Sequence, residues 1–162
     1  MDVARGTEYL HSRPYKRVVH GGLKPENVML NDKGDAVIAD FGVSSVQSYT
    51  NTVVPASSGL SLCYAAPELF MDPTAHREPS SDVYAFGIFL YAVLLQKVPF
   101  EGADPRILQR LIEDGQRPVV PEEWEKKHGE WADLLKACWA QDPQKRPAFA
   151  QIVTRLDIFK SQ

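Results

Sequence analysis

The chain has 162 residues, the size of one domain or of part of one, and its 18 Lys and Arg against 21 Asp and Glu leave a formal charge of −3. This balance gives no electrostatic footprint for nucleic acid or an anionic membrane, so we expect neither as a partner. Hydrophobic residues at 44% and charged residues at 24% are typical of a globular protein and argue against disorder.

The two cysteines, Cys63 and Cys138, exclude a disulfide scaffold and are too few to make a zinc site on their own. Both lie among apolar residues and are interpreted as buried free thiols, which favours a reducing compartment. No secretory signal opens the chain, and the longest apolar run, 83–95, has 13 residues where a membrane span needs about 20. We therefore expect a cytoplasmic protein.

The first part of the chain predicts one helix and a few short strands. An apolar stripe formed by Val3, Ala4, Tyr9 and Leu10 indicates a helix without a visible N-cap. Short apolar segments follow, and two of them flank a polar turn that predicts a β-hairpin with a four-residue loop. These segments are 18–19, 27–30 and 36–38, and the turn is 31–34.

The serine-rich stretch 44–61 has few large apolar residues and predicts a loop, and helices follow it. Their start signals are typical N-caps or a proline in the first turn, and the later ones show the 3–4 residue spacing of amphipathic helices. The predicted helices are 83–95 capped within 80–82, one capped by Asp104 before Pro105, one over 131–139, and one opened by Pro147.

Two polar segments on either side of the predicted hairpin are candidates for chemistry. Residues 20–27 precede the hairpin and contain Asn27, and Asp40 follows it. The amide oxygen of Asn27 and the carboxylate of Asp40 can then face the same point. Such ligands suit Mg²⁺, which takes one or two protein ligands and completes its shell with water and phosphate. Taken singly, each residue is better explained as a turn former than as a metal ligand.

Taken together, these segments resemble the protein kinase family, whose motifs are His-Arg-Asp-Leu-Lys-x-x-Asn, Asp-Phe-Gly and Ala-Pro-Glu. The order and spacing match over nearly the whole chain. A Lys-Pro-Glu-Asn catalytic loop combined with a Cys-Trp…Asp-Pro…Arg-Pro ending is most similar to tyrosine-kinase-like serine/threonine kinases. The matching residues are His20, Leu23, Lys24 and Asn27, then Asp40-Phe41-Gly42, Ala66-Pro67-Glu68, the segment 82–87 and the segment 138–147.

The resemblance implies a mainly α fold, the large lobe of a protein kinase. It would be a helical bundle with a short β-hairpin near the cleft. This partial kinase domain would span residues 1–162, with an activation segment at 40–68 and without the small lobe.

The resemblance also implies roles in ATP and Mg²⁺ chemistry. Asn27 and Asp40 would be the Mg²⁺ ligands, with Asp40 on the ion that bridges the β- and γ-phosphates of ATP. Lys24 would stabilise the transferring phosphoryl group, and Met29 would form the floor of the adenine site.

Other matching residues would be structural. His20 and Phe41 would stack as a hydrophobic spine on the helix of Asp82, and Gly42 would complete its motif. Glu68 and Arg146 would form a buried ion pair that ties the activation segment to the helical bundle.

Two departures from the family pattern bear on activity. Gly22 stands where the family has the Asp that accepts the substrate's proton, and losing such a base costs about 10²–10⁴-fold in rate. Gly21 replaces the Arg that clamps a phosphorylated activation segment, so phosphate added to residues 44–61 would lack that cation. The chain also contains no glycine-rich phosphate loop or strand lysine, so we expect ATP and Mg²⁺ binding to be weak or absent.

Three interpretations remain open at this point. The chain is a pseudokinase-type module that binds protein partners, or an incomplete ATP-dependent serine/threonine protein kinase domain, or an unrelated globular protein with accidental motifs. In the first two cases, a partner or a small lobe would cover an apolar surface around Val28 and Met29.

Overall fold

The computed structural model describes residues 1–15, 17–40, 45–46, 59–72 and 74–161. Helices dominate this part of the chain, as the sequence predicts, and none of its helices is long and apolar enough to cross a membrane. The elements in chain order are α1 Asp2–His11, β1 Val18–Val19, η1 Pro25–Asn27, β2 Val28–Leu30, β3 Ala36–Ile38, β4 Ser45–Val46, η3 Gly59–Tyr64, α2 Glu68–Met71, α3 Pro79–Leu95, α4 Pro105–Glu113, α5 Glu122–Lys127, α6 Gly129–Cys138, η4 Pro143–Lys145 and α7 Phe149–Lys160.

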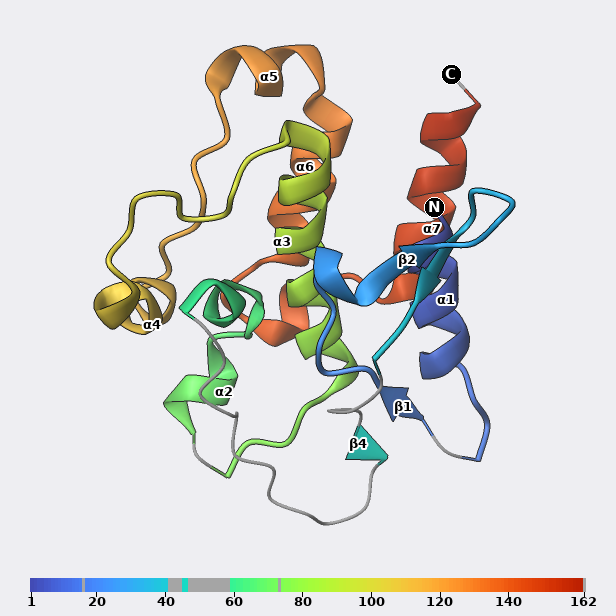
Figure 1. The fold of residues 1–162 in the computed structure, drawn as a ribbon, viewed down its shortest axis with the longest axis horizontal. Helices are drawn as coiled ribbons and strands as arrows, with labels where there is room; N and C mark the ends of the chain where they lie inside the picture. The colour runs from blue at the N-terminus through green and yellow to red at the C-terminus, as the bar shows by residue number, and fades with distance from the viewer. Residues whose placement is uncertain (16, 41–44, 47–58, 73, 162) are drawn as a thin grey trace.

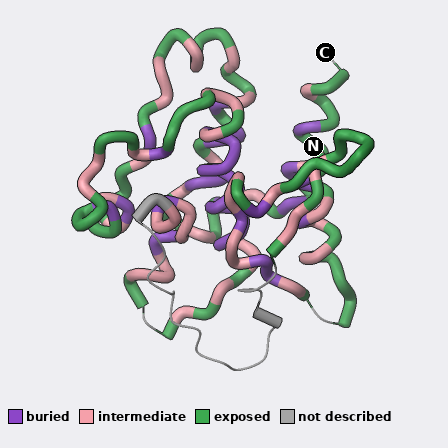
Figure 2. The backbone as a smooth tube through the Cα atoms, viewed as in Figure 1, coloured by how far each residue is buried: buried purple, intermediate pink, exposed green. Residues whose placement is uncertain are grey.

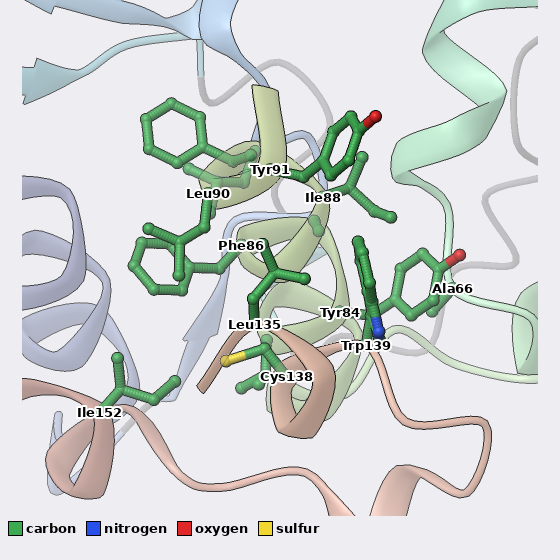
Figure 3. Packing of buried hydrophobic residues seen from close by; sticks show 14 of the residues in the cluster. Ala66, Tyr84, Phe86, Ile88, Leu90, Tyr91, Leu135, Cys138, Trp139 and Ile152 are labelled. Atoms are coloured by element: carbon green, nitrogen blue, oxygen red, sulfur yellow. The ribbon is translucent and has the colours of Figure 1, made fainter. Parts of the chain in front are cut away.

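Helix α3 runs through the middle of the molecule and is buried without interruption from Ser81 to Tyr91 (Figures 1 and 2). A helix that is apolar on all sides belongs inside a core rather than on its surface. Its closest neighbour is α6, and Figure 3 shows Leu135 and Cys138 packed beside the side chains of α3. At Gly87 a Cβ would lie 3.0 Å from the Cβ of Cys138, so the two helices approach so closely that a side chain at residue 87 would require one of them to shift.

The start of α3 differs from the prediction. The N-cap is Glu78 and the first helical residue is Pro79, so the predicted caps at 80–82 lie inside the first turn. A capping box explains the shift: the Glu78 side chain accepts from the backbone N–H of Ser81, whose Oγ accepts the Glu78 N–H at 3.0 Å. The carboxylate of Asp82 is therefore available for contacts outside its own helix.

The hairpin of β2 and β3 is antiparallel, with Met29 opposite Val37. Its loop has five residues, Asn31–Asp35, and not the predicted four. The extra residue is accommodated because the Asn31 side-chain oxygen accepts the N–H groups of Lys33 and Asp35, both at 2.9 Å.

Helix α1 carries the hairpin on one side and packs against α7 on the other (Figure 1). Val3 and Ala4 are buried as the predicted stripe requires, but Tyr9 is 60% exposed. Tyr9 instead lies under the guanidinium of Arg13 near the helix end, with the group 5.1 Å from its ring centroid.

The predicted loop at 44–61 contains regular structure at both ends. Ser45–Val46 forms β4, which pairs with β1 in an antiparallel ladder, and Gly59–Tyr64 forms the 3₁₀-helix η3. The rest of this stretch lies outside the described residues.

Further along, Asp104 is the N-cap of α4, as predicted, and accepts the N–H of Arg106 at 2.9 Å. Helix α7 begins at Phe149, two residues after the proline expected to open it.

Candidate functional site

A hollow of about 150 Å³ lies where the loop after β1 meets the start of α3 and the segment after η3. It brings together Lys24, Asn27 and Asp40, three of the residues predicted for the site, together with Gly22. Met29 does not line it and lies on the hairpin with 62% of its surface exposed. The full lining is Gly21, Gly22, Leu23, Lys24, Asn27, Asp40, Ser61, Tyr64, Ala65, Ala66, Leu69, Arg77, Ser81, Asp82 and Ala85.

Asp82 fixes the loop that forms one wall of the hollow. Its Oδ2 accepts the backbone N–H of His20 at 2.7 Å, and its Oδ1 accepts the N–H of Gly21 at 2.8 Å. A third contact joins Oδ2 to the ring Nε2 of His11 at 2.8 Å, and the carboxylate is 1% exposed. Two of these bonds go to the backbone, so they do not depend on a side chain at residue 21 or 22.

His11 is a site residue that the sequence analysis missed. It lies in the last turn of α1, and its ring also packs edge-on against Phe149 of α7 with centroids 5.2 Å apart. Nothing in the local pattern of residues 2–11 distinguishes it from an ordinary helix-ending histidine.

Gly21 and Gly22 differ in what the backbone allows. Gly21 has a φ of 70°, in the left-handed region that a side chain makes costly. Gly22 is under no such constraint, and a Cβ there would make ordinary contacts, the nearest at 3.5 Å from Nδ2 of Asn27. The fold therefore has room for a side chain at residue 22.

Lys24 and Asn27 are both held in place by local contacts. The Lys24 ammonium donates to the hydroxyl of Ser61 at 3.2 Å, which links the loop to η3. The buried side chain of Asn27 donates from Nδ2 to the carbonyl of Gly22 at 2.7 Å. Ser61 was assigned to the predicted loop, so its position beside Lys24 was missed.

His20 is fully buried, and its two ring nitrogens contact the backbone on either side of the hairpin. Nδ1 accepts the N–H of Gly22 at 3.2 Å, which leaves Nε2 to donate to the carbonyl of Ala39 at 3.2 Å. These partners fit the tautomer that carries its proton on Nε2. Phe41, the predicted stacking partner of His20, lies outside the described residues. Gly42 lies outside them too.

Asp40 lies at the exposed edge of the hollow with a φ of 58°. The left-handed conformation is uncommon for a residue other than glycine, although aspartate adopts it more readily than most. It directs the chain out of the hairpin next to Asn27, so the two candidate Mg²⁺ ligands line the same hollow.

Arg77 is a second cation in this wall and was not predicted from the sequence. It comes from the segment before α3 and is half-buried. Removal from water lowers the pKa of its guanidinium, and the negative charge of Asp82 acts in the opposite direction.

The predicted partners Glu68 and Arg146 form a two-armed ion pair, with N···O distances of 2.7 and 2.8 Å. The Arg146 side chain is fully buried, and it also donates to the carbonyls of Ser80, Ala140 and Gln141. Its guanidinium lies 5.2 Å from the ring centroid of Tyr84. This arginine joins the segment that closes the hollow to the helical bundle.

The described fold and the arrangement of this loop, hairpin and central helix define a protein-kinase-like large lobe. Residues 1–156 match the sequence model of the family described as protein tyrosine and serine/threonine kinase. The chain therefore belongs to the protein kinase family.

Individual relatives agree with this assignment. The chain is 34% identical over 160 residues to the serine/threonine/tyrosine-protein kinase HT1 of Arabidopsis thaliana, covering 98% of this chain and 38% of that protein. It is 34% identical to human ankyrin repeat and protein kinase domain-containing protein 1 and 35% identical to a putative serine/threonine-protein kinase/receptor of Acanthamoeba polyphaga mimivirus, covering 94% of this chain in both cases. It spans 21% and 9% of those two proteins.

Proposed function

We propose that this chain is a protein kinase domain that has lost phosphoryl transfer and acts by binding other proteins. One observation carries the proposal: residue 22, where the family has its catalytic base, is a glycine facing the hollow. A base accepts the proton of the attacking hydroxyl, and glycine has no group that can do so. The neighbouring Lys24 is a donor and cannot replace it.

The geometry around residue 22 supports a loss of chemistry without a loss of shape. Asp82 and Asn27 hold the loop through backbone atoms of His20, Gly21 and Gly22. These bonds do not need the missing carboxylate. A binding surface can therefore persist on a loop that no longer catalyses.

Asn27 and Asp40 are suitable ligands for Mg²⁺, and we expect them to bind the ion weakly. The two residues line one hollow and offer the one or two protein oxygens that Mg²⁺ usually takes. They would hold the ion, and its charge would neutralise bound phosphate. Within the described ranges, no group of three or more His, Cys, Asp or Glu side chains could hold a metal. Without a glycine-rich phosphate loop in the 162 residues, tight nucleotide binding has little to support it.

The direct test is incorporation of label from γ-phosphate-labelled ATP with Mg²⁺, into the chain itself and into a generic protein substrate. We expect no incorporation above that of heat-denatured protein. The matched variant is Gly22→Asp, which restores a carboxylate where a Cβ is sterically accepted. Incorporation by the unaltered chain would overturn the proposal and favour the enzyme interpretation.

A second measurement addresses nucleotide binding separately. We expect ATP with Mg²⁺ to leave the unfolding temperature unchanged, because only a ligand that binds the folded state raises it. A Mg²⁺-dependent rise of several degrees would count against a purely protein-binding role if Asp40→Ala removes it and Asp32→Ala, an exposed hairpin-loop control, does not.

A further inference from the structure

The connection between α1 and β1 carries a concentrated positive charge at one corner of the molecule (Figure 1). Its sequence, residues 12–17, holds three cations, whereas the whole chain has a formal charge of −3, so the rest of the chain carries −6. We propose that this connection, through Arg13, Tyr15 and Arg17, binds an acidic segment of a partner protein. None of the three residues lines the hollow, so the inference goes beyond the proposed function and names a second surface.

No neighbouring carboxylate neutralises the two arginines. Asp and Glu are absent from residues 9–25, and residues 41–67, which include the strand β4 paired with β1, contain no charged residue of either sign. Within the described ranges, no ion pair joins Arg13 or Arg17 to an acidic side chain, and both arginines are exposed. Their charge is therefore available to a partner.

Arg13 is already oriented by a contact with Tyr9. Its guanidinium lies 5.1 Å from the centroid of the Tyr9 ring and donates to the Tyr9 hydroxyl. A guanidinium has five N–H donors, and this bond uses one of them, so the others can reach a carboxylate. A side chain that is ordered before binding loses less conformational entropy when its ligand arrives.

Tyr15 lies between the two arginines in the sequence and is 101% exposed, so no other part of the described chain covers its ring. Tyrosine and arginine are among the residues that most often dominate the binding energy of protein interfaces. Pro14 precedes it and fixes one backbone angle, which lowers the entropy lost on binding. These features fit a segment whose carboxylates pair with the arginines and whose carbon atoms cover the ring.

An acidic protein segment suits this connection better than an anionic membrane does. Clusters that bind anionic lipids contain about 4–8 Lys or Arg residues, and this connection contains three. A lipid surface would also repel the charge of −6 on the rest of the chain, whereas a short acidic segment can contact the connection alone.

The test is fluorescence anisotropy on the full chain, with a fluorescein-labelled peptide of alternating glutamate and glycine as the probe. The matched peptide carries glutamine in place of glutamate. We expect the glutamate peptide to bind at least about tenfold more tightly, because only carboxylates form charge-assisted hydrogen bonds with the arginines. Added salt should weaken this binding, since it screens exposed charges.

Substitutions in the connection should locate the binding. Arg13→Gln and Arg17→Gln should each weaken it about threefold or more, and Tyr15→Ser should weaken it without changing the net charge. Arg110→Gln removes the same charge from α4, at the opposite edge of the molecule in Figure 1, and should change the affinity less than about 1.5-fold. Circular dichroism checks that each variant is folded.

Equal affinity for the glutamate and glutamine peptides would overturn the proposal, and so would equal losses in Arg17→Gln and Arg110→Gln. Binding to phosphatidylcholine vesicles that contain phosphatidylserine, without binding to the glutamate peptide, would assign the connection to a membrane and overturn the proposal as well. If Arg13→Gln does not fold, Arg17→Gln and Tyr15→Ser decide. Failure of the proposed function is distinguishable, because it would appear as label incorporated from ATP without any peptide.

Discussion

Arg146 and Glu68, 78 residues apart in sequence, meet in a two-armed ion pair at the base of the segment that closes the hollow. The arginine is fully buried and the glutamate is 24% exposed. The pair is not isolated, because Arg146 also satisfies three backbone carbonyls. Arg146 therefore joins Glu68 to three further points of the backbone.

We expect Arg146→Leu to lower the free energy of unfolding by about 3–5 kcal/mol, because it leaves Glu68 and three carbonyls without their donor. Glu68→Gln should cost a similar amount, because the fully buried Arg146 then keeps its charge without a carboxylate to compensate it. Arg5→Leu, which breaks the exposed pair with Asp157, should cost no more than about 1 kcal/mol. Urea unfolding measures all three, and equal losses for Arg146→Leu and Arg5→Leu would contradict this interpretation.

The two glycines of the loop should respond oppositely to alanine. Gly22→Ala should be neutral or stabilising by up to about 1 kcal/mol, because its conformation and surroundings accept a Cβ. Gly21→Ala should cost about 1–2 kcal/mol, because φ is 70°. Thermal unfolding of the two variants side by side gives the comparison. A larger loss at residue 22 than at residue 21 would show that the loop geometry is wrong.

Gly87 lies in the interior of α3, where alanine ordinarily stabilises a helix by about 1 kcal/mol. We expect the reverse. An added Cβ would lie 3.0 Å from Cβ of Cys138 and 3.1 Å from the backbone nitrogen of Trp139, so Gly87→Ala should cost about 1–3 kcal/mol. Chemical denaturation gives the sign of the change in unfolding free energy. A stabilised variant would mean that α3 and α6 lie further apart.

The two thiols should make the protein sensitive to alkali. Burial raises the pKa of Cys63 and of Cys138 from 9.0 to about 12. A group whose folded pKa lies above its unfolded pKa releases its proton on unfolding, so stability is complete below pH 9 and is lost as the pH rises towards 12. Unfolding free energy measured across this range should fall, and Cys138→Ala should reduce the slope.

The same thiols should resist alkylation by iodoacetamide at pH 8 in the folded protein, because the thiolate is the reactive form. Both should react once the chain is unfolded in urea. Alkylation of the folded protein at the rate of the unfolded chain would contradict their burial.

Much of the helical framework could be predicted because it depends on local signals. The N-cap at Asp104 and the apolar run of α3 can each be recognised from residues that are adjacent in the sequence. The predicted N-cap of α3 is too late in the chain, because Ser80, Ser81 and Asp82 are all residue types that favour a cap. The actual N-cap, Glu78, is fixed by its capping box with Ser81. The five-residue hairpin loop depends in the same way on one side chain, Asn31.

The candidate site was predicted only where family motifs mark it. Lys24, Asn27 and Asp40 stand in such motifs and line the hollow. Arg77 and Ser61 reach the same hollow through the tertiary fold, from segments without a local pattern. Long-range proximity of this kind is not encoded in periodicity or capping, so no reading of residues 59–77 by themselves would have found them.

Asp82 belongs to helix α3, and its two hydrogen bonds to the backbone hold the loop that borders the hollow. The shape of the hollow therefore depends on a helix residue outside that loop. The side chain at residue 22 is not needed to keep the shape of the loop, so a substitution there has little structural cost. The shape of a cleft and its chemistry can therefore change separately in evolution. An enzyme can lose its catalytic groups and keep the shape of its cleft for a different function.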